Sequence, residues 1–247
     1  MYAKGRVAEK EYRDVIKEAG TVGGLLDTHD GRVNLAHKPM RDRLRTILNT
    51  LGFDTTDWVR VVMYRRCFAF IQTLGPENLD VLEISAGSQW QRAFRFRRFT
   101  ETQFPEFDIC SQTLDSQYDL IIADQVFEHL QWPYRAGRNV FKMLRPGGVF
   151  IIATPFLLRV HNAPIDCSRW TEQGLSYLLQ ECGFPKDGIQ TDSWGNRACL
   201  IANLKRWRRY GWYRSLVNEP DYPLVVWAFA RKPDGPSRGA SLGVVQP

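Results

Sequence analysis

Short runs of apolar residues alternate along the chain with longer segments in which apolar residues recur at helical spacing. Two runs are clear: one covers residues 80–84, and the other covers residues 118–124 and is bounded by acids. Runs this short are typical of strands buried in a parallel sheet. By the same pattern we expect further strands over residues 98–102, 107–109, 149–154, 189–194 and 224–230.

The longer segments predict helices between these strands. The first strong one covers residues 54–74, where Asp57 can cap the start and Gly75-Pro76 stops the helix. Others are expected over residues 133–144, 171–182 and 197–210, with a turn over 145–148, and weaker ones over 7–19 and 40–50. Pro133 suits a first helical position and Thr171 suits a cap.

Strands that alternate with helices indicate a doubly wound α/β fold. We expect a Rossmann-like, mostly parallel sheet of seven strands with helices on both faces. Residues 54–232 would form this domain, and residues 1–53 an N-terminal helical extension or lid. The tail over residues 233–247 is rich in Pro, Gly and Ser and is predicted to be flexible.

The composition is ordinary for a globular protein, with 247 residues, 44% hydrophobic and 24% charged. The longest apolar stretch, residues 147–158, is too short to cross a bilayer, and the N-terminus has no signal-peptide core. We therefore expect a cytoplasmic protein without membrane contact. The five cysteines form no CxxC pair and no cluster with histidine, which argues against a metal site.

The net charge is +6, and two arginine-rich stretches, residues 92–98 and 205–209, also contain aromatic residues. Such stretches can bind single-stranded nucleic acid. An amphipathic surface with its apolar side chains turned inward is the preferred interpretation. The positive charge equally suits an anionic small molecule or a glycan.

Four small residues, Ser85-Ala86-Gly87-Ser88, follow the strand predicted over residues 80–84. With few side chains in the way, a ligand can lie close to the backbone there. Glu101 follows at the distance where nucleotide-binding α/β folds place an acid that binds ribose hydroxyls. Because ligands bind at the carboxyl ends of the strands, this loop, Glu101 and Asp124 should surround an adenosine-containing cofactor.

Three motifs carry a resemblance to a known family. The loop resembles motif I of class I S-adenosylmethionine-dependent methyltransferases, E/D-x-G-x-G-x-G, with Ser85, Gly87 and Gln89 at the glycine positions. Residues 118–130, YDLIIADQVFEHL, resemble the FDLVxxxxVLEHL signature of that family, and LRPGGVFIIATP, ending at Pro155, is similar to its LKPGGxxxxxTP block. The resemblance covers roughly residues 57–232 and is closest to the type 11-like methyltransferase domain. It implies an enzyme that uses S-adenosylmethionine.

The resemblance also implies which residues contact the cofactor. They are Glu83, Ser85, Ala86 and Gly87 at the methionine end, Glu101 and Thr102 at the ribose, Asp108 and Ile109 at the adenine, and Asp124 and Gln125 beside the reactive methyl group. For Glu128 and His129, the preferred interpretation is structural: an acid that caps or bridges a turn, and a histidine that donates to backbone.

The loop after the strand at 149–154 contains His161, Asp166, Arg169 and Trp170 and should overhang the methyl-transfer side. His161 could take the proton of an attacking hydroxyl or amine, with Asp166 orienting its ring. Arg169 and Trp170 are the candidate acceptor-binding residues. The competing interpretation is an Asp166–Arg169 bridge that stiffens the loop beside an uninvolved histidine. Similar H-x-x-P-x-D-x-x-R-x-T stretches occur in methyltransferases linked to glycan or secondary-metabolite biosynthesis.

The sequence therefore predicts methyl transfer to a small-molecule or sugar acceptor, and it leaves a homodimer open. One alternative is an RNA methyltransferase, although no RNA-binding module or N/D-P-P-Y/F motif is present. Another is a non-catalytic methyltransferase-like binding protein, which only the missing glycines support. An NAD dehydrogenase is weaker still, because no G-x-G-x-x-G follows the strand at 80–84.

Overall fold

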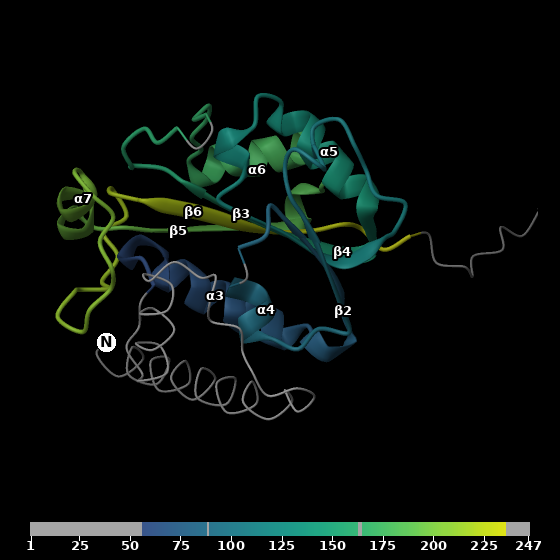
Figure 1. Cartoon of the computed structure of the whole chain (residues 1–247), viewed down its shortest axis with the longest axis horizontal. Coiled ribbons are helices and arrows are strands. Elements are labelled where there is room, and N and C mark those ends of the chain that lie inside the picture. Colours follow the sequence, from purple (N-terminus) through teal and green to yellow (C-terminus); the bar gives the residue numbers. More distant parts are fainter. Residues whose placement is uncertain (1–55, 88, 163–164, 236–247) are drawn as a thin grey trace, which may run out of the picture.

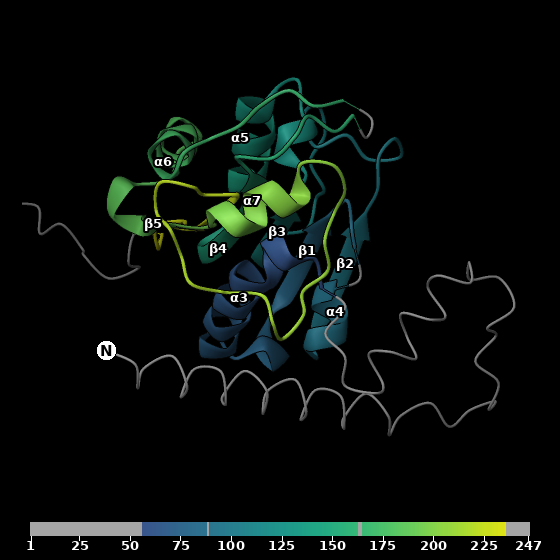
Figure 2. The ribbon, with the colours of Figure 1, turned by 90° about the vertical axis from the view of Figure 1, so that its left-hand side faces the viewer.

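The computed structural model describes residues 56–235, apart from Ser88 and residues 163–164. Within them, one sheet lies between two layers of helices (Figures 1 and 2). The N-terminal extension, with its two predicted helices, and the tail beyond residue 235 lie outside the described residues, so those predictions stay predictions.

The sheet has six strands in the order β2-β1-β3-β4-β6-β5. They are β1 (Asp80–Ile84), β2 (Arg98–Thr102), β3 (Tyr118–Asp124), β4 (Leu144–Pro155), β5 (Ile189–Trp194) and β6 (Val225–Arg231). The first four strands in that order are parallel, whereas β6 runs antiparallel to both β4 and β5. The chain steps outward from β1 to β2 and then returns to the other side of β1 to form β3. The predicted doubly wound, mostly parallel α/β fold is therefore confirmed, and the strand order reverses between β1 and β3.

The strand expected over residues 107–109 does not form, so the described residues contain six strands rather than seven. Asp108 Oδ1 accepts from the Cys110 N–H at 2.9 Å, and Asp108 Oδ2 accepts from the Ser111 hydroxyl at 2.9 Å. Such local bonds from an aspartate side chain stabilise a turn in competition with a strand. A second correction concerns residues 145–148, which were expected as a turn but belong to the start of β4.

Helices cover both faces of the sheet (Figure 1). Helices α3 (Val61–Thr73) and α4 (Gln89–Ala93) pack on one face, and α5 (Pro133–Met143) and α6 (Glu172–Glu181) pack on the other. Helix α7 (Arg197–Asn203) lies at the left end of the sheet in Figure 1. Short 3-10 helices are η2 (Trp58–Arg60), η3 (Pro76–Asn78), η4 (Phe127–His129) and η5 (Lys186–Gly188). None of the helices in the described residues is long and apolar enough to cross a membrane.

Helix boundaries follow local signals at α5 and α6 but not at α3 or α7. Helix α3 begins at Val61 after η2, not at residue 54, and Asp57, the expected cap, makes no side-chain cap hydrogen bond. Pro133 is the first residue of α5, and Thr171 caps α6 by accepting from the Gly174 N–H at 3.1 Å. The helix expected to run to residue 210 instead ends at Asn203, whose Oδ1 accepts from the Arg208 N–H at 2.9 Å. The Arg208 carbonyl in turn accepts from the Trp58 N–H, so a distant contact ends this helix.

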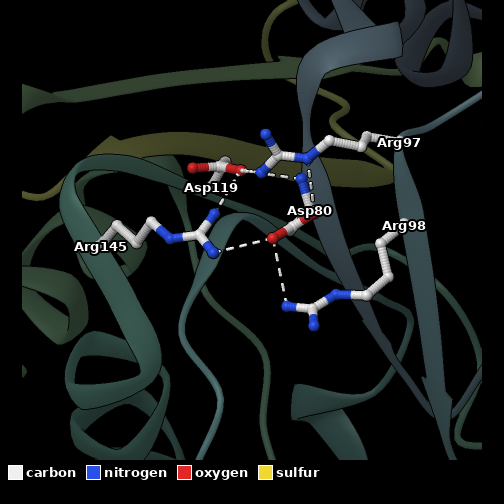
Figure 3. A network of polar contacts seen from close by, with 5 residues as sticks. All are labelled: Asp80, Arg97, Arg98, Asp119 and Arg145. Carbon is white, nitrogen blue, oxygen red and sulfur yellow. Dashed lines mark hydrogen bonds and ion pairs between the residues drawn. The ribbon is translucent and has the colours of Figure 1, made fainter.

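Two acids at the amino edge of the sheet share three arginines (Figure 3). Asp80, at the start of β1, accepts from Arg97 at 2.9 Å, Arg98 at 3.2 Å and Arg145 at 2.8 Å. Asp119, in β3, accepts from Arg145 at 2.6 Å and from Arg97 at 3.4 Å. The Asp80 side chain is only 10% exposed, and the hydrogen bonds from Arg97 and Arg145 lower the pKa of its carboxyl to about 2. This network joins the starts of four neighbouring strands.

We expect Asp80→Asn to lower the free energy of unfolding at pH 7 by about 1–3 kcal/mol, because the amide loses the charge that three arginines share. The folded-state pKa of Asp80 lies below the usual value near 4. Its stabilisation is therefore fully present above about pH 4 and is lost as the pH falls toward 2. Urea unfolding of both proteins between pH 7 and pH 3 measures this difference, which should shrink with falling pH.

Glu181→Gln is the matched control, because it removes an ion pair with Arg138 whose two side chains are both more than half exposed. That change should alter the free energy of unfolding by less than about 1 kcal/mol. Equal losses at positions 80 and 181 would contradict the role given to the Asp80 network.

Candidate functional site

The carboxyl ends of β1 and β3 are neighbours, since Ile84 of β1 pairs with Ala123 of β3. Shortly after these paired residues, each strand is followed by a residue with a left-handed backbone: Ser85 has φ 55° and Gln125 has φ 58°. A positive φ outside glycine is uncommon and turns the chain sharply away from the strand. Both loops therefore leave the sheet at the point where the strand order reverses.

The loop after β1 is held in place by the side chain of Glu83, which turns toward the backbone of the loop. Glu83 Oε1 accepts from the Gly87 N–H at 2.8 Å, whereas Glu83 Oε2 is buried and has no hydrogen-bond partner among the described residues. The residue is 2% exposed, and this burial raises the pKa of its carboxyl to about 7. The Ala86 N–H donates to the Thr102 carbonyl at 3.3 Å, which holds the loop against the end of β2. The site thus contains a buried acceptor atom that can still bind a donor.

Glu101 of β2 stands directly opposite Glu83 in the parallel register, and its side chain is exposed. Thr102 follows at the end of β2, and its hydroxyl donates to the Glu83 carbonyl at 3.4 Å. Two carboxylates therefore lie side by side at the carboxyl edge, one buried and one open to solvent.

Asp124, the last residue of β3, adds a third carboxylate. Its Oδ2 accepts from the Tyr64 hydroxyl at 2.6 Å, and its Oδ1 is buried without a hydrogen-bond partner in the described residues. Burial raises the pKa of the Asp124 carboxyl, against the opposing effects of Arg60 and the Tyr64 hydrogen bond. The side-chain nitrogen of the neighbouring Gln125 is also buried and unpaired within the described residues.

Tyr64 and Arg60 are site residues that the sequence did not reveal. Tyr64 occupies an apolar position of α3 and packs against the rings of Phe68 and Trp90, so its spacing alone predicts a core residue. Its hydroxyl nevertheless reaches Asp124, which is 60 positions away in the chain. Only the packing of α3 against the end of β3 shows this contact.

The predicted adenine contacts lie in the turn after β2. Both carboxylate oxygens of Asp108 already accept local hydrogen bonds, although a carboxylate has lone pairs to spare. Ile109 is 3% exposed and belongs to the hydrophobic core between the sheet, α5 and α6. The role of these two residues at an adenine ring remains a prediction.

The loop after β4 brings His161, Asp166 and Arg169 together. Asp166 accepts from the His161 N–H at 2.8 Å and binds Arg169 through both carboxylate oxygens, with Arg169 Nη2 at 2.6 Å from Oδ2. The bond from Arg169 lowers the pKa of the Asp166 carboxyl to about 2. The His161 Nδ1 atom lies 3.4 Å from Asp166 Oδ2, and burial lowers the pKa of its imidazole. Trp170 packs against the core.

This loop is docked on the segment that follows β3. The Cys167 N–H donates to the Glu128 carbonyl at 2.7 Å, and the Nδ1 atom of His129 is paired with the Ile165 carbonyl. As a result the rings of His129 and His161 lie edge to face, with centroids 5.2 Å apart. The backbone bond expected of His129 is therefore present, and it also positions His129 beside His161.

Comparison with known proteins shows the family to which the chain belongs. A model of a methyltransferase domain matches residues 59–190, which is more than half of the chain. Curated protein sequences give no match.

Solved structures with a similar fold are distant in sequence. An S-adenosylmethionine-dependent methyltransferase from Mesorhizobium loti is 15% identical over 66% of this chain and 96% of its own, with a TM-score of 0.41. One from Clostridium acetobutylicum is 11% identical over 80% of this chain and 100% of its own, with a TM-score of 0.42. A phosphoethanolamine N-methyltransferase from Haemonchus contortus, in complex with S-adenosylmethionine, is 11% identical over 69% of this chain and 53% of its own, with a TM-score of 0.44. The family-model match identifies the chain as a member of the class I S-adenosylmethionine-dependent methyltransferase family.

Proposed function

We propose that the protein transfers the methyl group of S-adenosylmethionine to a hydroxyl or amine of a small-molecule or sugar acceptor, in glycan or secondary-metabolite biosynthesis. One observation carries the cofactor side of this proposal. Glu83 and Asp124 each keep a buried carboxylate oxygen without a partner in the described residues, beside the exposed Glu101.

This set of acids fits S-adenosylmethionine by charge. The cofactor carries a sulfonium and an ammonium group, and its ribose has two hydroxyl donors, so unpaired carboxylate oxygens are suitable acceptors. The two phosphates of NAD would face the same carboxylates and be repelled. When bound, the sulfonium supplies a methyl group that is already activated for attack. The residues proposed to hold the cofactor are Glu83, Ser85, Ala86 and Gly87 at the methionine end, Glu101 and Thr102 at the ribose, Asp108 and Ile109 at the adenine, and Asp124 and Gln125 near the methyl group.

The acceptor side is proposed on the loop after β4. Asp166 holds the backbone of His161 and the guanidinium of Arg169, which fixes the position of the imidazole. His161 keeps its remaining nitrogen for the acceptor's proton, and burial favours its neutral form, as a base requires. Arg169 already pairs with Asp166, so we assign it to shaping the acceptor site together with Trp170.

Calorimetry tests the cofactor assignment. S-adenosylmethionine and S-adenosylhomocysteine should bind, and NAD should not. Glu101→Ala should weaken their binding at least about tenfold, because charge-assisted hydrogen bonds to ribose contribute about 1.5–3 kcal/mol each. Glu106→Ala, another exposed acid nearby, is the control and should leave the affinity unchanged. Saturation by NAD without a response to S-adenosylhomocysteine would overturn the proposal.

The affinity for S-adenosylhomocysteine should rise about tenfold between pH 6 and pH 8. The pKa of Glu83 is about 7 in the free protein, so its carboxyl changes from mostly protonated to mostly ionised across this range. The ionised form attracts the ligand's ammonium group, which stays charged. Glu83→Gln should remove this pH dependence, and a dependence that persists in the variant would assign it to another group.

His161→Ala should lower turnover by about two orders of magnitude or more, since general-base assistance typically contributes 10²–10⁴-fold. Release of S-adenosylhomocysteine in the presence of a panel of hydroxyl and amine acceptors measures turnover. The affinity for S-adenosylmethionine should stay within about twofold, because the imidazole belongs to the acceptor side. Full turnover in the variant would contradict a role for His161 as the base, and positioning of the acceptor beside the methyl group would then account for the transfer.

A further inference from the structure

Glu128, His129 and His161 form a cluster whose donor atoms face one another. A carboxylate oxygen of Glu128 and one ring nitrogen of each histidine all lie within 4.8 Å of one another. Glu128 and His129 belong to η4, directly after β3, whereas His161 comes from the loop after β4. The docking of that loop on the Glu128 carbonyl brings the three side chains together.

Glu128 is the unusual member of the cluster. Its side chain is completely buried, and neither carboxylate oxygen has a hydrogen-bond partner among the described residues. Oε1 points toward the Nε2 atom of His129, at 3.5 Å. A buried carboxylate without hydrogen-bond partners is strongly disfavoured unless it takes up a proton or a bound cation neutralises it.

Both histidines are oriented by their other ring nitrogen. His129 Nδ1 is paired with the Ile165 carbonyl, and His161 Nδ1 lies 3.3 Å from the Arg159 carbonyl and close to Asp166. A proton on each Nδ1 leaves a lone pair on each Nε2. Metal-binding histidines are typically held in this way, with the second nitrogen donating to a carbonyl or a carboxylate.

We propose that Glu128, His129 and His161 bind one divalent transition-metal ion of the zinc type. Two imidazoles and one carboxylate form a donor set found in catalytic zinc sites, where three protein ligands leave a position open for an oxygen of a bound molecule. Ligand atoms about 2.0–2.1 Å from zinc lie about 3.3–3.4 Å apart in a tetrahedron. The Glu128–His129 separation of 3.5 Å is close to this spacing, and a ring nitrogen of His161 lies within 4.8 Å of both donor atoms.

The surrounding charges agree with such an ion. Arg169, which lies in the loop after β4, binds Asp166 through both carboxylate oxygens and so does not compete for Glu128. A site with two imidazoles favours zinc, cobalt or iron over magnesium, which prefers oxygen ligands. The Trp207 ring packs edge to face on His161 at 5.7 Å and forms one wall beside it.

Metal binding by Glu128, His129 and His161 does not require a particular methyl acceptor, and it does not require that the protein transfer methyl groups. If the ion is bound through His161 Nε2, that nitrogen is not free to accept a proton. His161 would then hold the ion, which would lower the pKa of a bound acceptor hydroxyl so that its proton could pass to solvent, and the loss of turnover in His161→Ala keeps the same direction.

Metal binding to the full chain tests the proposal. After treatment with EDTA and dialysis, the protein should bind one equivalent of Zn²⁺ by calorimetry, and Co²⁺ should give the visible absorption of a four- or five-coordinate site. Mg²⁺ should not compete. Glu128→Gln and His161→Gln should each weaken Zn²⁺ binding by about 100-fold or more. Mutating a residue that only hydrogen-bonds to a metal ligand typically lowers the metal affinity by 10–100-fold, and removing the ligand itself should cost more.

Three controls make the result specific. Cys167→Ser removes the exposed thiol, and His29→Ala with His37→Ala removes the other two of the four histidines; all should retain binding. Binding of S-adenosylhomocysteine by the ligand variants shows that they are folded. Absence of Zn²⁺ binding in the parent protein, or binding that survives Glu128→Gln and His161→Gln, would overturn the metal site. Zn²⁺ binding without any affinity for S-adenosylhomocysteine would support the metal site and contradict the proposed methyl transfer.

Discussion

The parallel pairing of β1, β3 and β4 is the constraint on which the rest of the structure depends. Parallel strands all start at one edge of the sheet and all end at the other. The acids at the starts, Asp80 and Asp119, meet arginines and are paired. The acids at or near the ends, Glu83, Asp124 and Glu128, each keep at least one buried oxygen that no described residue pairs. The same architecture therefore places acids paired with arginines at one edge of the sheet and acids with unpaired oxygens at the other.

The contrast between the edges is visible in the pKa values. Hydrogen bonds from Arg97 and Arg145 lower the pKa of Asp80 to about 2, whereas burial raises those of Glu83 and Glu128 to about 7 and 8. Buried unpaired carboxylates destabilise a fold and are typical of functional sites. They favour positively charged partners, and both proposed occupants of this edge, the sulfonium cofactor and a divalent ion, are cations.

The cofactor and the divalent ion would be bound by residues from different loops. At the end of β1, Glu83 accepts from the Gly87 N–H through Oε1 and keeps Oε2 without a partner in the described residues, so this end of the strand suits the cofactor that the family uses. The loop after β4 reaches the segment after β3 through Cys167 and Ile165, and thereby faces His161 toward His129. Asp124 lies between the two sets, tied to α3 through Tyr64. In the proposed function, acceptor chemistry and cofactor binding would meet at the ends of neighbouring strands.

The sequence by itself determined the strands β1, β2 and β3, the start of α5 at Pro133, the cap of α6 at Thr171, and the family, because each rests on a local pattern of residues. It also indicated which strand ends carry acids. Only the tertiary structure decided that residues 107–109 form a turn, that α7 ends at Asn203, and that Tyr64 binds Asp124. It also decided that Glu128, His129 and His161 converge. The turn depends on short-range bonds from Asp108 that compete with strand formation, so the apolar pattern alone misassigned it. The other features depend on contacts between segments far apart in the chain, which no local pattern encodes.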